Sequence, residues 1–136
     1  MLIVRPKGQG PRPKGWSREK GMIVAAIDDL IFSIKVKTAA KSLNADVYFE
    51  RSADKLLDTI REKRPALIIF DLNSRLRPVD AIAALKRDPD LKAIRTLGYV
   101  SHVDTATIDA ARAAGIDQVM ARSAFVTGLG EILTSA

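Results

Sequence analysis

The sequence of 136 residues contains no cysteine and a single histidine, His102. The lack of cysteine excludes a disulfide framework, an iron–sulfur cluster and a thiolate zinc site. One histidine is too few for a histidine-rich metal centre, and no nucleophile elbow of a serine hydrolase accompanies it. No apolar run reaches the ~18 residues that a membrane span needs, and the apolar start MLIV meets Arg5 at once, unlike a secretory signal. These absences predict a soluble, cytoplasmic protein, and the length suits a single domain.

Most of the positive charge lies at the start of the chain. The formal net charge is +6, and residues 1–20 supply +5 of it, with six basic residues against one acidic residue. This segment is rich in proline and glycine and has no apolar period. We therefore expect a flexible basic N-terminal extension, 1–21, ahead of a domain at 22–136. The plain interpretation of the extension is a solvated tail; the other is an arm that binds nucleic-acid phosphates, with Trp16 stacked on a base.

From residue 22 onward, segments typical of buried strands alternate with segments typical of helices. Strands are predicted at 22–28, 46–50, 66–71, 94–100 and 117–121. Helices are predicted at 30–43, 53–63, 78–87, 104–114 and 123–134. Parallel strands need helical crossovers of a single hand. The sequence therefore predicts an α/β protein with a doubly wound five-stranded parallel sheet, a flavodoxin-like (βα)5 sandwich of three layers.

Three of the predicted helices carry further expectations. The apolar stripe of the first helix is predicted at Leu30, Ile34, Ala39 and Leu43. Ser52 precedes the second helix and is expected to cap it. The last helix has apolar residues that suit a core face and also a homodimer contact, namely Phe125, Leu129, Ile132 and Leu133.

Polar side chains follow the predicted strands at their carboxyl ends, where ligands bind in doubly wound sheets. Asp28 and Asp29 follow the first strand, Asp71 ends the third, Ser101 ends the fourth and Arg122 follows the fifth. Carboxylates that converge repel one another, and a hard divalent cation such as Mg²⁺ relieves the repulsion. A carboxylate beside Mg²⁺ can attack phosphorus and form an aspartyl phosphate. Taken singly, each aspartate also suits a turn or a helix cap.

In this order and spacing, the residues resemble the receiver domain of bacterial two-component response regulators, of the chemotaxis type. The resemblance covers residues 22–134. IDD (27–29) is similar to the family's acidic pair, and LIIFDLN (67–73) to the strand that ends in its phosphoacceptor aspartate. DPDLKAIRTLGYVS (88–101) is similar to the approach to the fourth strand, and AGIDQVMARSA (114–124) to the fifth strand and the loop beyond.

The resemblance implies a site and a set of partners. Asp71 would accept a phosphoryl group, and Ser101 and Arg122 would contact the phosphoryl oxygens. The implied Mg²⁺ ligands are Asp28, Asp29, Asp71 and the backbone carbonyl of Asn73. A histidine kinase or a phosphotransfer protein would donate the group, and a downstream protein target would read it. No output domain follows, so the expected role is a stand-alone phosphoprotein in phosphorelay signal transduction rather than an enzyme.

Five positions depart from the family pattern. Arg122 stands where the family has lysine, and Ser123 follows where proline is usual. Val119 stands at the position of the switch aromatic, and Ser74-Arg75 replace the usual Met-Pro. Arginine keeps the charge of lysine but not its compact shape. The sequence therefore leaves open a second interpretation, a degenerate pseudo-receiver that binds a protein partner without being phosphorylated.

Two weaker alternatives concern other ligands. A flavodoxin-like cofactor binder would need a Gly/Ser/Thr-rich phosphate cradle, and the loops after the first and third strands lack one. His102 follows Ser101 at the rim of the predicted site and is expected to be a neutral surface residue rather than a ligand.

Overall fold

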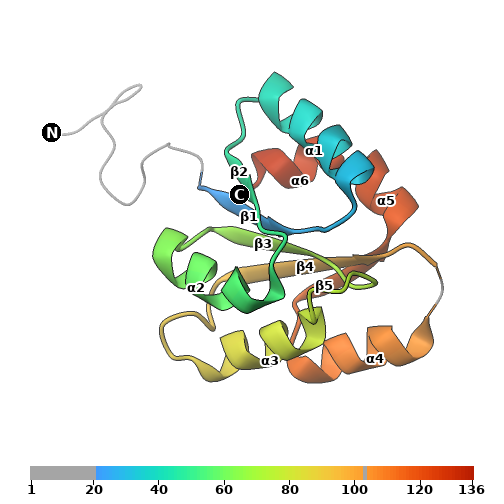
Figure 1. Ribbon diagram of the computed structural model, residues 1–136. Coiled ribbons are helices and arrows are strands. Elements are labelled where there is room, and N and C mark those ends of the chain that lie inside the picture. The colour runs from blue at the N-terminus through green and yellow to red at the C-terminus, as the bar shows by residue number, and fades with distance from the viewer. Residues whose placement is uncertain (1–20, 103) are drawn as a thin grey trace, which may run out of the picture.

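Five parallel strands form one sheet in the computed structural model, which describes residues 21–102 and 104–136 (Figure 1). The strands are β1 (Ile23–Ala26), β2 (Val47–Phe49), β3 (Leu67–Asp71), β4 (Arg95–Val100) and β5 (Gln118–Ala121). Their order across the sheet is β2-β1-β3-β4-β5, and every neighbouring pair is parallel. This order is that of a flavodoxin-like doubly wound sheet, so the predicted fold class is confirmed. The predicted nucleic-acid arm lies outside the described residues.

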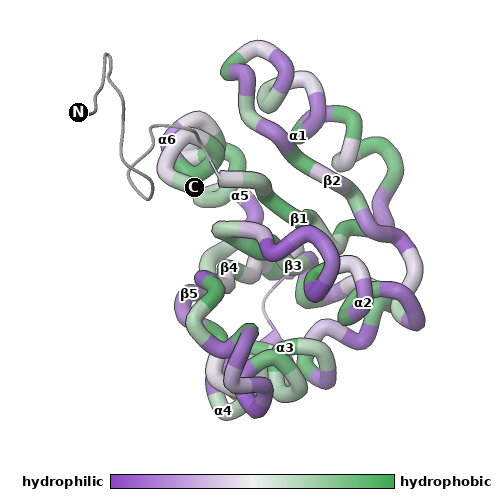
Figure 2. Tube along the Cα trace, turned by 90° about the vertical axis from the view of Figure 1, so that its left-hand side faces the viewer, coloured by the Kyte–Doolittle hydropathy of each residue, from purple (hydrophilic) through white to green (hydrophobic). Residues whose placement is uncertain are grey.

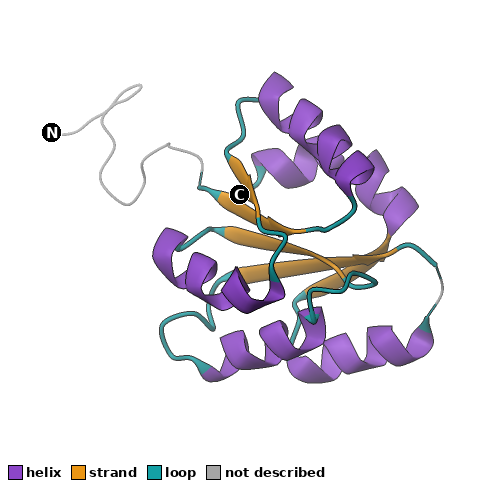
Figure 3. Cartoon of the chain, viewed as in Figure 1, coloured by secondary structure: helices purple, strands orange, loops and turns teal. Residues whose placement is uncertain are grey.

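Helices cover both faces of the sheet and make the fold a three-layer sandwich (Figures 1 and 3). The helices α1 (Leu30–Ser42), α5 (Arg122–Thr127) and α6 (Leu129–Thr134) lie on one face. The helices α2 (Ala53–Lys63), α3 (Pro78–Arg87) and α4 (Thr105–Ala114) lie on the other face. None of the described helices is both long and apolar enough to cross a membrane.

The central strands β1 and β3 are buried along their whole length, and the tube of β1 is hydrophobic throughout (Figure 2). Side chains alternate between the two faces of a strand, so each central strand feeds two cores. Val24 and Phe70 belong to the core under α2, α3 and α4. Ile23 and Ile69 belong to the core under α1, α5 and α6. Strands buried on both faces therefore read as the continuous apolar runs seen in the sequence.

The predicted apolar stripe of α1 is wrong at its first half. Leu30 and Ile34 are 62% and 55% exposed, and the helix instead buries Phe32, Val36 and Ala40. The cause lies at the start of the helix, where Asp29 Oδ1 accepts from the Phe32 N–H at 3.0 Å. With this cap in place, residues 32, 36 and 40 face the sheet. Ala39 and Leu43 still pack against the edge of that core.

Ser52 occupies the N-cap position of α2, but its side chain makes no capping hydrogen bond. Its backbone N–H donates instead to Glu50 Oε2 at 3.1 Å. Glu50 is buried, and its Oε1 accepts from the Thr59 hydroxyl at 2.6 Å. The start of α2 is therefore held by a buried carboxylate two residues earlier, rather than by the predicted serine cap.

The last predicted helix is two helices, α5 and α6, separated at Gly128. Phe125, Leu129 and Leu133 are buried in the core beneath them. Of the four residues that suit a dimer contact, Ile132 alone remains partly exposed. Most of the apolar surface of these helices is therefore used inside the protomer, and a homodimer through them stays a prediction.

Asp117 ties β5 to β4 and should be a stability determinant. Its Oδ2 accepts from the backbone N–H of Thr96 at 2.8 Å and from the Thr96 hydroxyl at 3.0 Å. Thr96 is almost fully buried, so Asp117→Ala would leave that N–H without a partner. We expect a loss of about 1–2 kcal/mol in the free energy of unfolding at neutral pH, measured by urea denaturation.

The same contact should make the loss depend on pH. Burial alone would raise the pKa of Asp117, but the hydrogen bonds from Thr96 and the charge of Lys86 together lower it below its usual value. A lowered carboxyl pKa stabilises the fold above the usual aspartate value, and the stabilisation disappears as the pH falls through the lower folded value. The difference between wild type and Asp117→Ala should therefore shrink in acid. The control is Asp109→Ala. Asp109 is an exposed residue of α4, so this change should alter the free energy of unfolding by less than about 0.5 kcal/mol.

Candidate functional site

The carboxyl edge of the sheet gathers the residues that the sequence predicts for the site. Asp28 and Asp29 follow β1, Asp71 is the last residue of β3, and Ser101 follows β4. Arg122 is the first residue of α5, directly after β5. Hydrogen bonds and ion pairs link residues from all these strand ends, so the edge forms one polar cluster.

The loop after β3 is folded back onto the cluster by its own backbone. The N–H of Asn73 donates to Asp71 Oδ1 at 3.0 Å, and the side-chain oxygen of Asn73 accepts from the Ser101 N–H at 2.7 Å. The N–H of Arg75 donates to Asp28 Oδ2 at 3.0 Å, across 47 residues of sequence. These three bonds hold the ends of β1, β3 and β4 together.

Asp29 has both carboxylate oxygens engaged. Oδ1 caps α1 through the Phe32 N–H at 3.0 Å, and Oδ2 lies 3.6 Å from Arg122 Nη2. The negative charge also suits the N-terminus of a helix, where the backbone dipoles leave a partial positive charge. Asp29 therefore orients α1 and Arg122 as much as it adds charge to the site.

Arg122 is held in place by three neighbours. Besides its ion pair with Asp29, its Nη1 donates to the Ser101 hydroxyl at 3.5 Å. The guanidinium lies over the ring of Phe32, with Cζ 3.9 Å from the ring centroid, a cation–π arrangement. The side chain is still about one-third exposed, at 35%. A single cation thus faces the acidic cluster from the side of Ser101.

Asp71 is buried, with an exposed fraction of only 6%. Burial raises its pKa above the usual value, the Asn73 N–H lowers it, and the charges of Asp28 and Asp29 raise it further against the lowering charge of Arg122. Ionisation of Asp71 is therefore less favourable in the folded protein than in the unfolded chain. As the pH rises through the interval above the usual aspartate value, this carboxyl group reduces stability. A bound cation would reverse that penalty.

The oxygen atoms at this edge fit a magnesium ion. Asp28 and Asp71 each have one carboxylate oxygen without a hydrogen-bond partner among the described residues, Oδ1 and Oδ2 respectively. No three acidic or histidine side chains of the described residues are grouped to hold a metal ion. Mg²⁺ needs fewer, because it keeps several waters and commonly binds one or two carboxylates. Among the described residues, Asp28 and Asp71 thus each offer a free carboxylate oxygen at this edge, whereas both oxygens of Asp29 already contact other groups.

Tyr99 is a member of this neighbourhood that the sequence analysis did not single out. It lies on β4 directly opposite Asp71 in the sheet register, and it is fully buried. Its hydroxyl is the one buried side-chain polar atom of the described residues without a hydrogen-bond partner. Burial raises the pKa of Tyr99 far above its usual value, and the charge of Asp71 raises it further. The hydroxyl is thus a protonated donor. In the sequence, its position two residues before Ser101, on a strand next to β3, could have indicated that it lies near the site.

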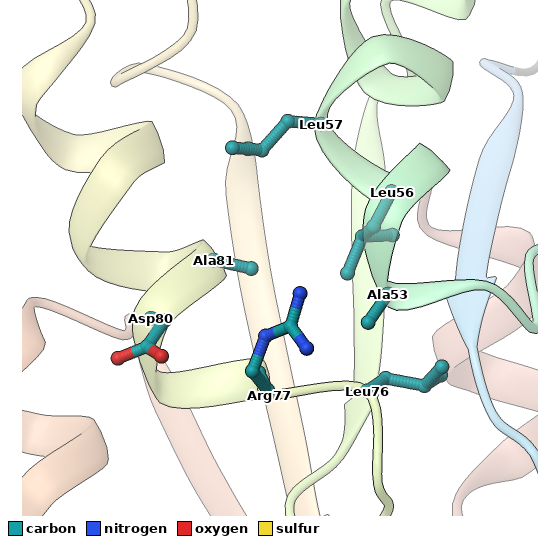
Figure 4. Close-up of a pocket in the computed structure, with 7 residues that line it drawn as sticks. All are labelled: Ala53, Leu56, Leu57, Leu76, Arg77, Asp80 and Ala81. Atoms are coloured by element: carbon teal, nitrogen blue, oxygen red, sulfur yellow. The ribbon is translucent and has the colours of Figure 1, made fainter.

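A separate pocket lies between α2 and α3 (Figure 4). It has a volume of about 110 Å³ and is lined by Ala53, Leu56, Leu57, Leu76, Arg77, Asp80 and Ala81. Arg77 points across it toward α2 and pairs with Asp54 at 3.1 Å. None of the site residues predicted from the sequence lines this pocket.

Comparison with known proteins supports the fold through structure rather than sequence. No family model and no curated protein matches the sequence. The phosphorylated cyanobacterial phytochrome response regulator RcpA matches with a TM-score of 0.72 at 20% identity, over 86% of this chain and 91% of that chain. The chemotaxis response regulator CheY4 of Vibrio cholerae matches with a TM-score of 0.74 at 14% identity, over 86% and 98% of the two chains.

A third match comes from a sensor kinase. The receiver domain of the sensor histidine kinase PA1611 of Pseudomonas aeruginosa was solved with a magnesium ion coordinated in its active-site cleft. It matches with a TM-score of 0.74 at 13% identity, over 86% of this chain and 97% of that chain. Together with the strand order of the sheet, these matches show that the chain has the fold of response regulator receiver domains.

Proposed function

We propose that this protein is a phosphorelay receiver that accepts a phosphoryl group on Asp71. The observation that carries the proposal is the buried Asp71 carboxylate, which keeps one oxygen without a partner among the described residues and faces Ser101 and Arg122 across the edge of the sheet. The receiver fold supports the same conclusion, since phosphorylated and magnesium-bound receivers are among the similar structures.

The chemistry is a transfer between two side chains. An oxygen of Asp71 bonds to phosphorus while the bond from phosphorus to the ring nitrogen of a donor phosphohistidine breaks, and the nitrogen keeps the electron pair. Mg²⁺, when bound to Asp28, Asp71 and the Asn73 carbonyl, supplies positive charge to the phosphoryl oxygens. Arg122 and Ser101 donate hydrogen bonds to the same oxygens, where negative charge develops during the transfer.

The partners follow from that reaction. A histidine kinase or a phosphotransfer protein supplies the phosphohistidine, and a downstream protein binds the phosphorylated form. The protein acts as a signalling module rather than as an enzyme with a diffusing substrate. We place it in the cytoplasm as a soluble domain formed by residues 22–136.

A pseudo-receiver that is never phosphorylated is the second candidate. The observation that favours it is the closed arrangement of Arg122, which already pairs with Asp29 at 3.6 Å and with Ser101 at 3.5 Å. In that arrangement the guanidinium takes the place where a phosphoryl group would bind. The protein would then bind its partner through the resting conformation alone.

Intact mass spectrometry separates the two candidates. Purified protein is incubated with Mg²⁺ and acetyl phosphate, with Asp71→Asn, Arg122→Lys and a sample in EDTA alongside. We expect wild type to gain the mass of one phosphoryl group, and Asp71→Asn and the EDTA sample to gain none. Asp71→Asn should also unfold at a higher temperature than wild type, because burial and the charges of Asp28 and Asp29 oppose the native carboxylate.

Three other results would change the assignment. Absence of the adduct in both wild type and Arg122→Lys contradicts the phosphoacceptor proposal. An adduct in Arg122→Lys alone means that Arg122 keeps a competent site silent. Binding of Mg²⁺ without any adduct supports the pseudo-receiver.

A further inference from the structure

We propose that the Tyr99 hydroxyl is a positioning group for phosphorylated Asp71. It has no hydrogen-bond partner in the part of the resting protein that the structure describes, and it donates a hydrogen bond to the phosphorylated side chain. This inference deepens the proposed function and rests on it. Tyr99 would bias the site toward the phosphorylated state and report that state to the helices on its side of the sheet.

The first argument is the state of the hydroxyl itself. Tyr99 is fully buried, and its hydroxyl has no hydrogen-bond partner within residues 21–102 and 104–136. A buried donor without an acceptor is destabilising, and phenylalanine would fill the same space without that penalty. A buried polar group without a partner is unusual and needs an explanation, and a role at a functional site is one. The Tyr99 hydroxyl is therefore a donor that lacks an acceptor among the described residues of the resting protein.

The second argument is the place of the hydroxyl. Tyr99 and Asp71 are direct partners in the register of β3 and β4, so their side chains leave the sheet on the same face. The charged groups that act on the hydroxyl are those of the site: Asp71, Arg122, Asp29 and Asp28. Tyr99 thus lies on the same face of the sheet as Asp71, inside the core under α1, α5 and α6.

The third argument is what phosphorylation adds at this place. A phosphoryl group brings three strong acceptor oxygens, whereas the resting Asp71 has one oxygen already occupied by the Asn73 N–H. Arg122 and Ser101 donate hydrogen bonds to the phosphoryl oxygens on the solvent side of the cluster. Tyr99 is the protonated donor on the core side. An interaction made in one state alone shifts the population toward that state.

The fourth argument is the set of rings that surrounds Tyr99. Its ring stacks on Phe125 of α5, with centroids 4.7 Å apart, and meets Phe32 of α1 at 5.3 Å. Phe32 in turn carries the guanidinium of Arg122 on its face. Phosphorylation would change the contacts of Arg122, which lies on Phe32, and of Tyr99, which stacks on Phe125. Both ends of the aromatic cluster would then be affected.

The test compares Tyr99→Phe with Tyr48→Phe. Tyr48 is the other tyrosine of the chain and is 41% exposed on β2. Each protein is incubated with Mg²⁺ and acetyl phosphate, and the phosphorylated fraction is followed by intact mass. Wild type labelled with carbon-13 at the tyrosine ζ position is followed by NMR, and Tyr48→Phe assigns the two signals.

We expect Tyr99→Phe to hold about tenfold less phosphorylated protein at equilibrium than wild type, the effect of one lost hydrogen bond. Its resting form should unfold at the same or a higher temperature, since the lost oxygen has no partner there. Tyr48→Phe should match wild type in both respects. On phosphorylation the Tyr99 signal should move and the Tyr48 signal should stay.

Three outcomes overturn the inference, and they can be told apart. An adduct in wild type with an unmoved Tyr99 signal, or with an equal yield in Tyr99→Phe, refutes the role of Tyr99 and leaves the proposed function intact. Absence of an adduct in wild type refutes both together. A lower unfolding temperature of resting Tyr99→Phe also contradicts the inference, because it would mean that the hydroxyl is already paired.

Discussion

Arg122→Ala is expected to slow phosphorylation of Asp71 by about 100-fold, the typical effect of removing one preorganised donor from a site of charge development. Arg122 combines two contributions, a positive charge and a hydrogen-bond donor, both aimed at the space beside Ser101. Its removal leaves Asp29 unpaired and leaves the cluster with three carboxylates and no facing cation among the site residues. The rate is measured with acetyl phosphate at saturating Mg²⁺.

Arg122→Lys is the matched variant, because it keeps the charge and loses the planar guanidinium. We expect it to retain a rate within about tenfold of wild type if charge is the main contribution. A magnesium titration gives an independent check, because removal of the Arg122 side chain should strengthen Mg²⁺ binding while it slows phosphorylation. Arg122→Ala should bind Mg²⁺ more tightly than wild type, since a competing cation has been removed. Weaker Mg²⁺ binding together with an unchanged phosphorylation rate would contradict this account of Arg122.

Phe125→Ala is expected to lower the free energy of unfolding by about 3–5 kcal/mol, as the removal of a large buried aromatic side chain usually does. Phe125 is fully buried, stacks on Tyr99 at 4.7 Å and lies 6.0 Å from Phe32. The substitution therefore removes apolar burial and two aromatic contacts at once. A domain of this kind has about 5–15 kcal/mol in total, so much of its stability would be lost. Urea unfolding followed by far-UV circular dichroism measures the change.

The control for Phe125→Ala is Ile31→Ala on α1. Ile31 is 82% exposed, so its truncation should change the unfolding free energy by less than about 0.5 kcal/mol. A loss of less than about 1 kcal/mol for Phe125→Ala would mean that α5 is not packed as described. A loss for Ile31→Ala similar to that of Phe125→Ala would mean that this face of α1 is covered in solution.

The order of the elements and the edge that holds the site could be predicted from the sequence, because both depend on local patterns. The apolar runs of β1 and β3 are buried on both faces, so they stand out without any knowledge of their neighbours. Parallel strands place their carboxyl ends at one edge, and this rule alone brings Asp28, Asp71 and Ser101 together.

The errors arose where one specific contact, rather than the pattern of apolar residues, decides the outcome. Whether Leu30 or Phe32 faces the core depends on the Asp29 cap and on rings contributed by β4 and α5. The replacement of the Ser52 cap by Glu50 depends on the Thr59 hydroxyl of the following helix. Gly128 separates two short helices, whereas the spacing of their apolar residues is that of one continuous helix. The periodicity of the sequence shows which residues are apolar, but it does not predict which residues they pack against.

The site residues that the sequence did not reveal act through backbone atoms or through the core. Tyr99 reads as one more apolar residue of a buried strand, because its register with Asp71 is a property of the sheet. Asp29 was predicted as a metal ligand, and that role stays a prediction; in the structure its two oxygens contact the Phe32 N–H and Arg122. Residue type alone does not show how many of its oxygens remain available.

The bond from the Arg75 N–H to Asp28 gives a meaning to one of the departures from the receiver pattern. The family usually has proline at this position, and proline has no amide hydrogen to donate. Arg75, unlike proline, can donate this main-chain bond, which ties the loop to the neighbouring strand end. Because this bond uses only the main chain of residue 75, any residue except proline can supply it, and position 75 is left free to change its side chain without releasing the loop.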